Sequence, residues 1–314
     1  MSASTPDRPA AIGVDLGGSK IEVTLFAADM TVRESCRQPT PRSTYADLLA
    51  ALEHEVFRFR KLAETADLPV GIGVPGLVHP DSGVSVCANL VANGHALARD
   101  LTERIGGRVV IANDCKCFTL SESRGGAGDG RARVFGLIVG TGLGGGLCQD
   151  GRLVLGLNGL PGEIGHYALP AHIVARHDLP LVACGCGRTG CMETLVSGTG
   201  MARLALALTG RTLSAAEIAT APDDIDTARV LVTWTELMAE LLHTIQLHID
   251  PDCIVLGGGL SNIAGLETRL VDALKKSALP SVRLPEIVKP AFGDSSGVRG
   301  AALLALQNDG TDAQ

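Results

Sequence analysis

Two segments far apart in this chain follow the same pattern: an apolar run, a glycine-rich turn and a second apolar run. The first spans residues 11–26 and turns at residues 15–20, and the second spans residues 134–148 and turns at residues 140–146. Apolar runs on either side of a short glycine-rich segment are typical of a β-hairpin. A unit that occurs twice in one chain predicts two similar lobes with a cleft between them.

Elsewhere in the chain, apolar patterns predict strands and helices in alternation. Continuous apolar runs predict strands at residues 70–74, 109–112 and 253–256. Apolar residues at helical spacing predict helices at residues 46–63, 97–105, 115–122, 196–208, 230–248, 266–276 and 298–306. Residues 150–195 show little regular periodicity. Alternating strands and helices indicate a layered α/β fold.

The boundary between the two expected lobes falls at a glycine-rich and polar stretch, residues 125–132. We expect an N-terminal lobe of residues 1–128, to which residues 296–314 return, and a C-terminal lobe of residues 129–295. The length of 314 residues fits two domains, because a single core rarely grows beyond about 250–300 residues.

The composition excludes several classes of protein. A chain with 46% hydrophobic and 19% charged residues has enough apolar surface to fold, so we do not expect a disordered protein. A net charge of −7 argues against a general nucleic-acid surface, and no apolar run reaches the length of a membrane span. The first nine residues lack the apolar core of a secretion signal, and the nine cysteines then indicate reduced thiols. We therefore expect a cytoplasmic protein.

The first glycine-rich turn is a candidate phosphate site. Its glycines let the backbone come close to a phosphate, whose oxygens can then accept hydrogen bonds from exposed N–H groups. Asp15 lies at a strand end, where its carboxylate can meet a hydrated Mg²⁺. The alternative is an ordinary hairpin with an aspartate on the surface. The candidate residues are Gly13, Asp15, Gly17, Gly18, Ser19 and Lys20.

The second turn and a third glycine cluster add to this interpretation. Because a triphosphate needs donors from both sides of a cleft, two matching hairpins favour a nucleotide site more than either hairpin alone. The third cluster follows the predicted strand at residues 253–256, where a nucleoside could lie; the alternative is a plain turn between strand and helix. The candidates are Gly140, Thr141, Gly142, Gly144 and Gly145 in the second turn and Gly257, Gly258 and Gly259 in the third cluster.

Asn113 and Asp114 follow one predicted strand and precede a predicted helix. In phosphoryl transfer, an aspartate placed beside the substrate accepts the proton of the attacking alcohol. Both residue types are also preferred as helix N-caps, so a purely structural role is the alternative. One residue can serve both purposes.

The strongest local signal is a set of four potential metal ligands: His166, Cys184, Cys186 and Cys191. Three cysteines within eight residues, separated by glycines, let the chain fold tightly around an ion. Three thiolates and one imidazole complete a tetrahedral zinc site. Because such a set leaves no open position for water, we interpret the metal as structural. The alternative is a group of ordinary buried thiols.

Two glutamates lie beside these ligands in the sequence. Glu163 precedes His166 by three residues, and Glu193 follows Cys191 by two. If zinc fixes both segments, both carboxylates can face one small polar ligand, and a sugar with its hydroxyl donors suits such acceptors. Without zinc, two solvated surface glutamates would be the simpler interpretation.

The motifs together, in this order, resemble the ROK family of bacterial sugar kinases and related repressors. The resemblance covers about residues 11–306, and Ser19 stands where threonine is more usual. Its segments are residues 15–20 and 140–146 (phosphate motifs), 112–114 (catalytic segment), 159–166 and 184–193 (signature and zinc loop) and 257–259 (adenosine motif).

The resemblance implies the two-lobed actin/Hsp70/hexokinase-like (ribonuclease H-like) fold with a central cleft. It also implies an enzyme that uses ATP and Mg²⁺ to phosphorylate a sugar and that contains structural Zn²⁺. Asp114 would be the general base, the glycine-rich hairpins would hold the ATP phosphates, and a homodimer is plausible. His166 would bind the sugar through one ring nitrogen and zinc through the other. The sugar-binding residues would be Gly76, Asn89, Asn113, Asp114, Glu163, His166 and Glu193.

The long segment between His166 and Cys184, together with residues 39–42 and 88–90, resembles the N-acetylglucosamine kinases of the family. This implies N-acetyl-D-glucosamine as the sugar, phosphorylated at its 6-hydroxyl. The family's glucokinase, fructokinase and N-acetylmannosamine kinase activities remain alternatives. A sugar-responsive repressor is a different class, but only 14 residues precede Asp15, too few for its DNA-binding module.

Overall fold

The structure is a computed structural model that describes residues 9–87, 90–221 and 224–307. The chain divides into two compact units, each built from more than one segment. The first unit contains Met1–Gly126, Arg152–Pro161 and Phe292–Gln314, and the second contains Ala127–Gly151 and Gly162–Ala291. The segment Arg152–Pro161, which we expected in the second lobe, therefore belongs to the first unit.

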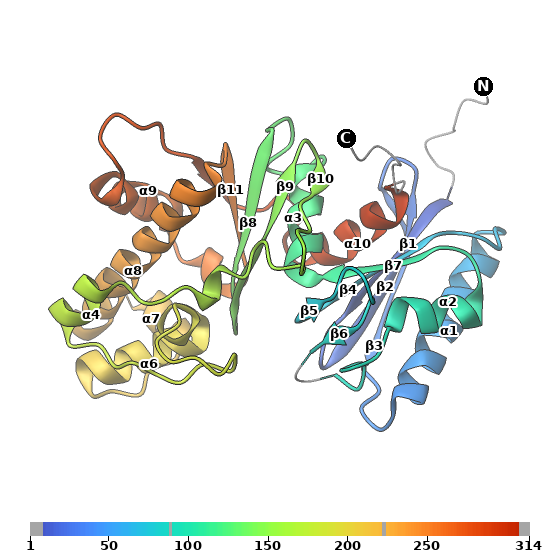
Figure 1. The fold of residues 1–314 in the computed structure, drawn as a ribbon, viewed down its shortest axis with the longest axis horizontal. Coiled ribbons are helices and arrows are strands. Elements are labelled where there is room, and N and C mark those ends of the chain that lie inside the picture. The colour runs from blue at the N-terminus through green and yellow to red at the C-terminus, as the bar shows by residue number, and fades with distance from the viewer. Residues whose placement is uncertain (1–8, 88–89, 222–223, 308–314) are drawn as a thin grey trace. The chain divides into compact units, whose positions relative to one another are not determined.

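The first unit is built on a sheet with strand order β3-β2-β1-β4-β7 (Figure 1). β1, β2 and β3 pair antiparallel, whereas β1, β4 and β7 pair parallel, so the carboxyl ends of the last three strands share one edge. The strands of this sheet are β1 (Pro9–Leu16), β2 (Lys20–Ala27), β3 (Val32–Pro39), β4 (Val70–Val74) and β7 (Val109–Asn113). β5 (Leu77–Val78) and β6 (Ser85–Val86) form a separate two-stranded sheet, and the residues of the short strand β10 (Arg152–Leu153) also belong to the first unit. Its helices are α1 (Tyr45–Leu62), α2 (Leu97–Ile105), α3 (Asp114–Ser123), the 3₁₀ turn η3 (Gly293–Ser295) and α10 (Ser296–Leu306).

Side chains at alternate positions of β1 face opposite sides of this sheet. Ile12 and Val14 lie in the core under α1 and α2, whereas Ala11 packs with α10 on the other side. Gly13 shares the α10 face, and a Cβ there would lie 2.1 Å from the Val298 carbonyl oxygen. Gly13 is therefore needed so that α10 can approach the sheet.

The second unit has strands β9, β8, β11 and β12 side by side in that order. β8 and β9 pair antiparallel as a hairpin, and β8, β11 and β12 pair parallel. The strands are β8 (Arg133–Val139), β9 (Leu143–Gln149), β11 (Cys253–Gly257) and β12 (Glu286–Val288). The helices are η1 (Ile164–His166), α4 (Ala171–His177), α5 (Glu193–Val196), α6 (Gly198–Thr209), α7 (Ala215–Thr220), α8 (Ile225–Ile249), η2 (Gly259–Asn262) and α9 (Leu266–Ser277).

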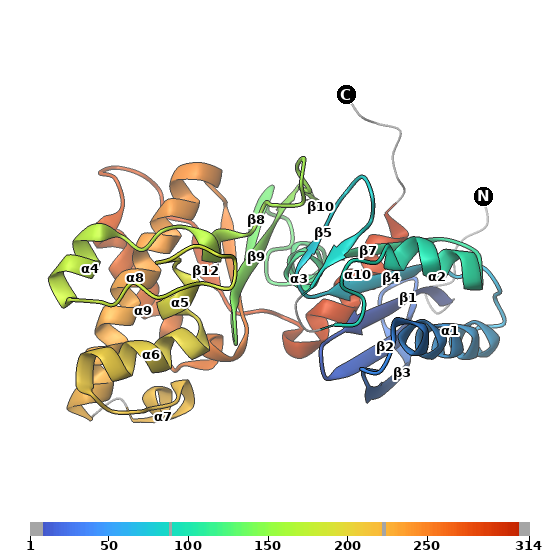
Figure 2. The same cartoon turned by 60° about the horizontal axis from the view of Figure 1, so that its bottom comes forward.

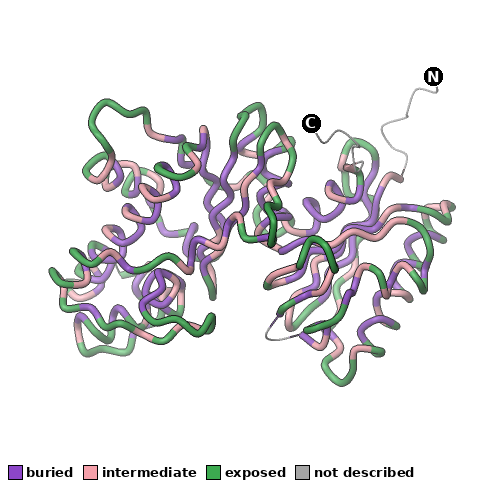
Figure 3. Tube along the Cα trace, in the orientation of Figure 1, coloured by how far each residue is buried: buried purple, intermediate pink, exposed green. Residues whose placement is uncertain are grey.

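Helix α8 organises the core of the second unit. Trp234 in its middle is fully buried, and its Nε1 donates to the Val196 carbonyl at 2.8 Å. This bond fixes the end of α5 against α8. Figure 2 shows α5, α6 and α8 within this unit from a second direction, and Figure 3 shows that buried residues follow the strands and the inner sides of the helices.

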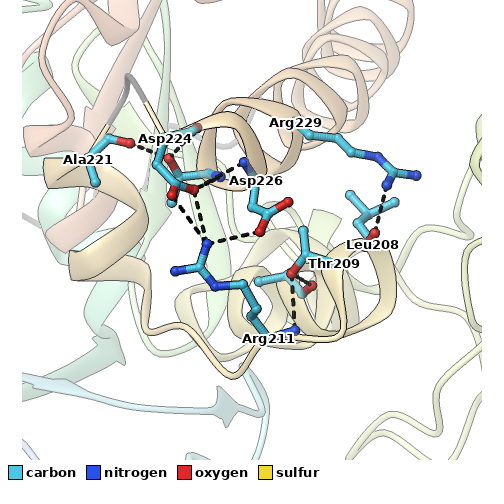
Figure 4. Close-up of polar contacts among 9 residues, drawn as sticks. Leu208, Thr209, Arg211, Ala221, Asp224, Asp226 and Arg229 are labelled. Atoms are coloured by element: carbon cyan, nitrogen blue, oxygen red, sulfur yellow. Dashed lines mark hydrogen bonds and ion pairs between the residues drawn. The ribbon is translucent and has the colours of Figure 1, made fainter.

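Polar contacts join residues at the end of α6 to residues at the start of α8 (Figure 4). Asp224 caps α8 by accepting from the N–H groups of Asp226 and Thr227. Arg211 Nη1 lies 3.2 Å from Asp224 Oδ1 and 2.9 Å from Asp226 Oδ2. Because exposed ion pairs contribute little stability, we expect these contacts to add little to the stability of the unit.

Most predicted elements are present, and the differences have local reasons. The single helix expected at residues 196–208 is two helices, α5 and α6, because Ser197 breaks the run and caps α6 through its Oγ. The stretch 150–195, expected to be irregular, contains the helix α4. The edge strands β3 and β12 were not predicted. No helix among the described residues is long and apolar enough to cross a membrane.

Candidate active site

The carboxyl edge of the parallel strands in the first unit gathers several of the predicted residues. Asp15 lies near the end of β1, and Asn113 ends β7 directly before Asp114. Gly76 follows β4, which lies between these two strands. This is the edge of a parallel α/β sheet at which ligands usually bind.

Asp15 is half-buried, and its carboxyl group lies on the α10 side of the sheet. A Cβ on Gly297, in the first turn of α10, would lie 3.7 Å from Asp15 Cγ. The pKa of Asp15 is raised from 3.8 to about 6, mainly by burial and to a smaller extent by the negative charges of Asp114 and Glu22. Asp15 and Asp114 therefore interact electrostatically at this edge.

Asn113 takes the N-cap role that the sequence offered for both residues, and the catalytic role of Asp114 stays a prediction. Asn113 is the N-cap of α3, since its Oδ1 accepts from the N–H groups of Cys115 and Lys116 at 2.9 and 3.2 Å. Its Nδ2 donates to the Gly76 carbonyl at 2.9 Å. Asp114 is the first residue of the helix, and its Oδ1 accepts from Cys115 N at 2.8 Å. Burial raises the pKa of the Asp114 carboxyl above its usual value.

The first glycine-rich turn is held from one side by residues that follow β3. Thr40 Oγ1 donates to the Gly17 carbonyl at 2.6 Å, and Arg42 donates to the Gly18 carbonyl through Nε and Nη2 at 3.1 and 2.9 Å. In a trans peptide the C=O and the following N–H point in opposite directions. The N–H groups of Gly18 and Ser19 therefore point away from Thr40 and Arg42.

The second glycine-rich turn is held in a similar way by the start of α6. Gly198 N donates to the Gly140 carbonyl at 2.7 Å, and Thr199 Oγ1 donates to the Thr141 carbonyl at 3.2 Å. The N–H groups of Thr141 and Gly142 therefore point away from α6. In each unit, hydrogen bonds from one side thus hold two consecutive carbonyl groups of the turn. The N–H group that follows each of these carbonyls points to the opposite side of the turn.

The remaining glycines of the predicted nucleotide site lie close to this second turn. Gly258 has φ +81°, and a Cβ there would lie 2.5 Å from the Val139 carbonyl oxygen, just before the turn. Gly257 ends β11, and Gly259 begins η2. The turn itself is shorter than expected, because Gly144 and Gly145 lie within β9, where Gly145 pairs with Leu137.

The four predicted metal ligands come together in the second unit. The ligand atoms of His166, Cys184, Cys186 and Cys191 all lie within 4.8 Å of one another. His166 Nδ1 lies 3.7 Å from Cys184 Sγ, and the Sγ atoms of Cys186 and Cys191 are also 3.7 Å apart. Zinc ligands at about 2.0–2.3 Å in tetrahedral geometry are separated by roughly 3.5–3.8 Å. The donor set and its spacing therefore fit a zinc ion.

The two glutamates lie beside this cluster. Glu163 Oε2 is 3.8 Å from His166 Nε2, the ring nitrogen opposite the one that faces Cys184. Glu193 Oε1 lies 3.9 Å from Cys184 Sγ, and its Oε2 accepts from Leu143 N at 3.0 Å. Glu193 therefore connects the metal cluster to the second glycine-rich turn, a structural link that the sequence did not predict.

A model of the ROK family matches residues 11–308, nearly the whole chain. The chain belongs to the ROK family. The resemblance inferred from the motifs is thus confirmed, as is the α/β fold of that family. A Thermus thermophilus ROK hexokinase structure matches with a TM-score of 0.83 and 29% identity over 94% of this chain and 97% of its own.

Curated ROK relatives match over nearly their full length. An N-acetylgalactosamine kinase of Shewanella sp. (strain ANA-3) is 40% identical over 93% of this chain and 95% of its own. An N-acetyl-D-glucosamine kinase of Histophilus somni (strain 129Pt) is 39% identical over 95% of this chain and 99% of its own. A Streptomyces griseus ROK glucokinase structure, solved with glucose and AMPPNP, shares the fold with a TM-score of 0.76 at 24% identity, covering 95% of this chain and 99% of its own.

Within this ROK chain, one predicted residue cannot be placed, and two residues with a role at the first turn were not predicted to have it. Asn89, predicted to bind sugar, lies outside the described residues. Thr40 and Arg42 were noticed only because residues 39–42 resemble part of the family, and no local pattern gave them a role. Their contacts with the first turn span 23 and 24 residues of sequence, so only the folded chain reveals them.

Proposed function

We propose that the chain transfers the γ-phosphoryl group of ATP to the 6-hydroxyl of N-acetyl-D-glucosamine, with Asp114 as general base. The chain is an ATP-dependent sugar kinase of the ROK family. Identities of 39% and 41% to N-acetyl-D-glucosamine kinases, each over 95% of the chain, support the choice of sugar. The single structural observation that carries the mechanism is the position of the half-buried Asp114 at the first residue of α3, at the same sheet edge as Asp15.

Asp114 accepts the proton of the attacking hydroxyl, so that the sugar oxygen can bond to the γ-phosphorus while the bond to the ADP oxygen breaks. Its raised pKa makes it a stronger base than an exposed aspartate. Asn113, through its bonds to the first turn of α3 and to Gly76, holds this carboxylate at the carboxyl edge of the sheet.

Sugar binding is assigned to Asn113, Glu163, His166 and Glu193, with Gly76 and Asn89 completing the proposed set. The carboxylates accept from sugar hydroxyl groups. His166 contributes Nε2, which lies on the Glu163 side of the ring, while Nδ1 faces the thiols. A zinc ion held by His166 and the three cysteines would fix this orientation of the ring.

The nucleotide is assigned to the two glycine-rich turns and to residues 257–259. The outward N–H groups of Gly18, Ser19, Thr141 and Gly142 supply phosphate donors, and Asp15 and Lys20 complete the first turn. When bound, Mg²⁺ would offset the charge of the phosphates. The bonds from Thr40 and Arg42 orient the first pair of donors before ATP arrives.

N-acetyl-D-galactosamine is a second candidate substrate, because a kinase named for that sugar is 40% identical over 93% of the chain. The deciding experiment is an ATP-coupled assay with N-acetylglucosamine, N-acetylgalactosamine, N-acetylmannosamine, glucose and fructose. The proposal expects the highest kcat/KM for N-acetylglucosamine. A higher value for another sugar would replace the substrate, and a lack of turnover with every sugar would contradict the kinase assignment.

A further inference from the structure

Lys116 is a buried lysine next to the proposed base that the mechanism has not used. It is the third residue of α3, only 3% of it is exposed, and its Nζ donates to the Gly159 carbonyl at 2.7 Å. Burying an ammonium group costs free energy unless polar or charged groups compensate for its lost hydration. The polar and charged groups near the Lys116 ammonium group should therefore indicate what this lysine does.

The acceptor of this bond lies in the segment Arg152–Pro161, which belongs to the first unit. Gly159 has φ +70°, and a Cβ there would lie 2.8 Å from the Val78 carbonyl oxygen of β5. The backbone at Gly159 therefore packs closely against β5, and the Gly159 carbonyl is held by Lys116 Nζ. Four residues later the chain reaches Glu163, a proposed sugar ligand.

Lys116 and Asp114 lie two residues apart in the same helix, so the side chain of Lys116 brings a positive charge to the end of α3 that carries Asp114. This charge favours the ionised carboxylate, whereas the neighbouring carboxylate of Asp15 on β1 repels Asp114. Other charged groups on α3 and α10 are engaged at the far end of α3. Arg299 donates to the carbonyls of Ser121 and Arg124, and Glu122 accepts from Ser296 Oγ. Lys116 is thus the cation on α3 that is positioned to act on Asp114.

We propose that Lys116 is a positioning residue for phosphoryl transfer: its ammonium group anchors Gly159 ahead of the proposed sugar-binding segment and carries a positive charge two residues from Asp114 in the same helix. The inference rests on the proposed function, because it assumes that Asp114 is the base. One side chain thereby links the base to the chain segment that leads to Glu163.

The test compares Lys116→Met, which removes the charge and the donor, with Lys116→Arg, which keeps both. Across the pH range of activity, Lys116→Met should shift the acidic limb of the kcat profile upward by about one pH unit. Its KM for the sugar should rise by about tenfold, with an unchanged KM for ATP. In Lys116→Arg the acidic limb of the kcat profile should stay at the wild-type position. Lys61→Met, an exposed lysine of the same unit, is the matched control and should change neither quantity.

The outcomes separate this inference from the function on which it rests. A wild-type protein without turnover would contradict the proposed function itself. An active wild type together with an unchanged acidic limb and sugar KM in Lys116→Met would overturn the inference. If circular dichroism shows that Lys116→Met does not fold, Gly159→Ala decides, because its methyl group forces the acceptor away from β5. The inference then requires an increased sugar KM with an unchanged acidic limb, and a wild-type sugar KM in that variant would refute it.

Discussion

Thr40 Oγ1 donates a hydrogen bond of 2.6 Å to the carbonyl oxygen of Gly17. Thr40 is only 6% exposed, and its backbone N–H also donates to the Ser19 carbonyl at 3.1 Å. Because the Gly17 carbonyl is held in this direction, the N–H of Gly18 points the opposite way. The shape of the proposed phosphate turn therefore depends on a side chain outside the turn as well as on its glycines.

Replacing Thr40 with valine keeps the shape of the side chain and removes this donor. A lost hydrogen bond that leaves a buried carbonyl without its partner costs about 1–3 kcal/mol. We expect the KM for ATP to rise by about tenfold and the KM for the sugar to stay unchanged. Thr244→Val removes a comparable side chain–backbone bond in α8 and serves as the control. An unchanged KM for ATP in Thr40→Val would show that the turn does not need this bond.

Asp15→Asn should stabilise the protein in the absence of nucleotide at neutral pH. The folded-state pKa of about 6 is above the usual 3.8, so the folded protein binds this proton more tightly than the unfolded chain. Stability from this group is therefore fully present below about pH 4 and is lost as the pH rises through about 6. Because asparagine carries no charge to bury, Asp15→Asn should raise the free energy of unfolding at neutral pH by about 2–3 kcal/mol.

The measurement for Asp15 is the midpoint of thermal unfolding as a function of pH. The midpoint of Asp15→Asn should exceed that of the wild type at about pH 7, and the two should converge near about pH 4. Asp81→Asn changes an exposed carboxylate of the same unit and should follow the wild type. A neutral-pH midpoint of Asp15→Asn equal to or below the wild-type value would argue against a costly buried charge.

The metal cluster predicts about one zinc ion per chain in elemental analysis of the purified protein. Cys186→Ser should release the zinc and lower the midpoint of thermal unfolding, because the ion would join η1 to the loop that carries the cysteines. Cys36→Ser changes a thiol in the first unit and should retain the zinc. A folded and active wild-type protein that contains no metal would rule out the structural role.

Continuous or strongly periodic apolar patterns made the core elements predictable. The strand at residues 70–74 and the helix at residues 97–105 have the bounds expected from the sequence, because each buries a regular set of apolar side chains. The missed elements lack such a pattern. β3 exposes most of its residues at the edge of the sheet, and α4 buries only Ile173.

The candidate site was predictable where its chemistry is local in the sequence. The cysteines lie within eight residues of one another, and His166 was grouped with them as the fourth ligand of a tetrahedral zinc site. The bonds that orient the first turn join residues more than 20 positions apart, and so does the bond from Lys116 to Gly159, with a separation of 43. Such contacts depend on tertiary packing, and no local periodicity reports them.

The central claim is that Asp114 takes the proton from the sugar hydroxyl. The most direct test is kcat of Asp114→Asn with ATP and N-acetylglucosamine, together with calorimetric titration of sugar binding. Asparagine keeps the size of the side chain but cannot accept the proton, so we predict a loss in kcat of at least about a hundredfold with nearly unchanged sugar affinity. A kcat close to the wild-type value would contradict the account.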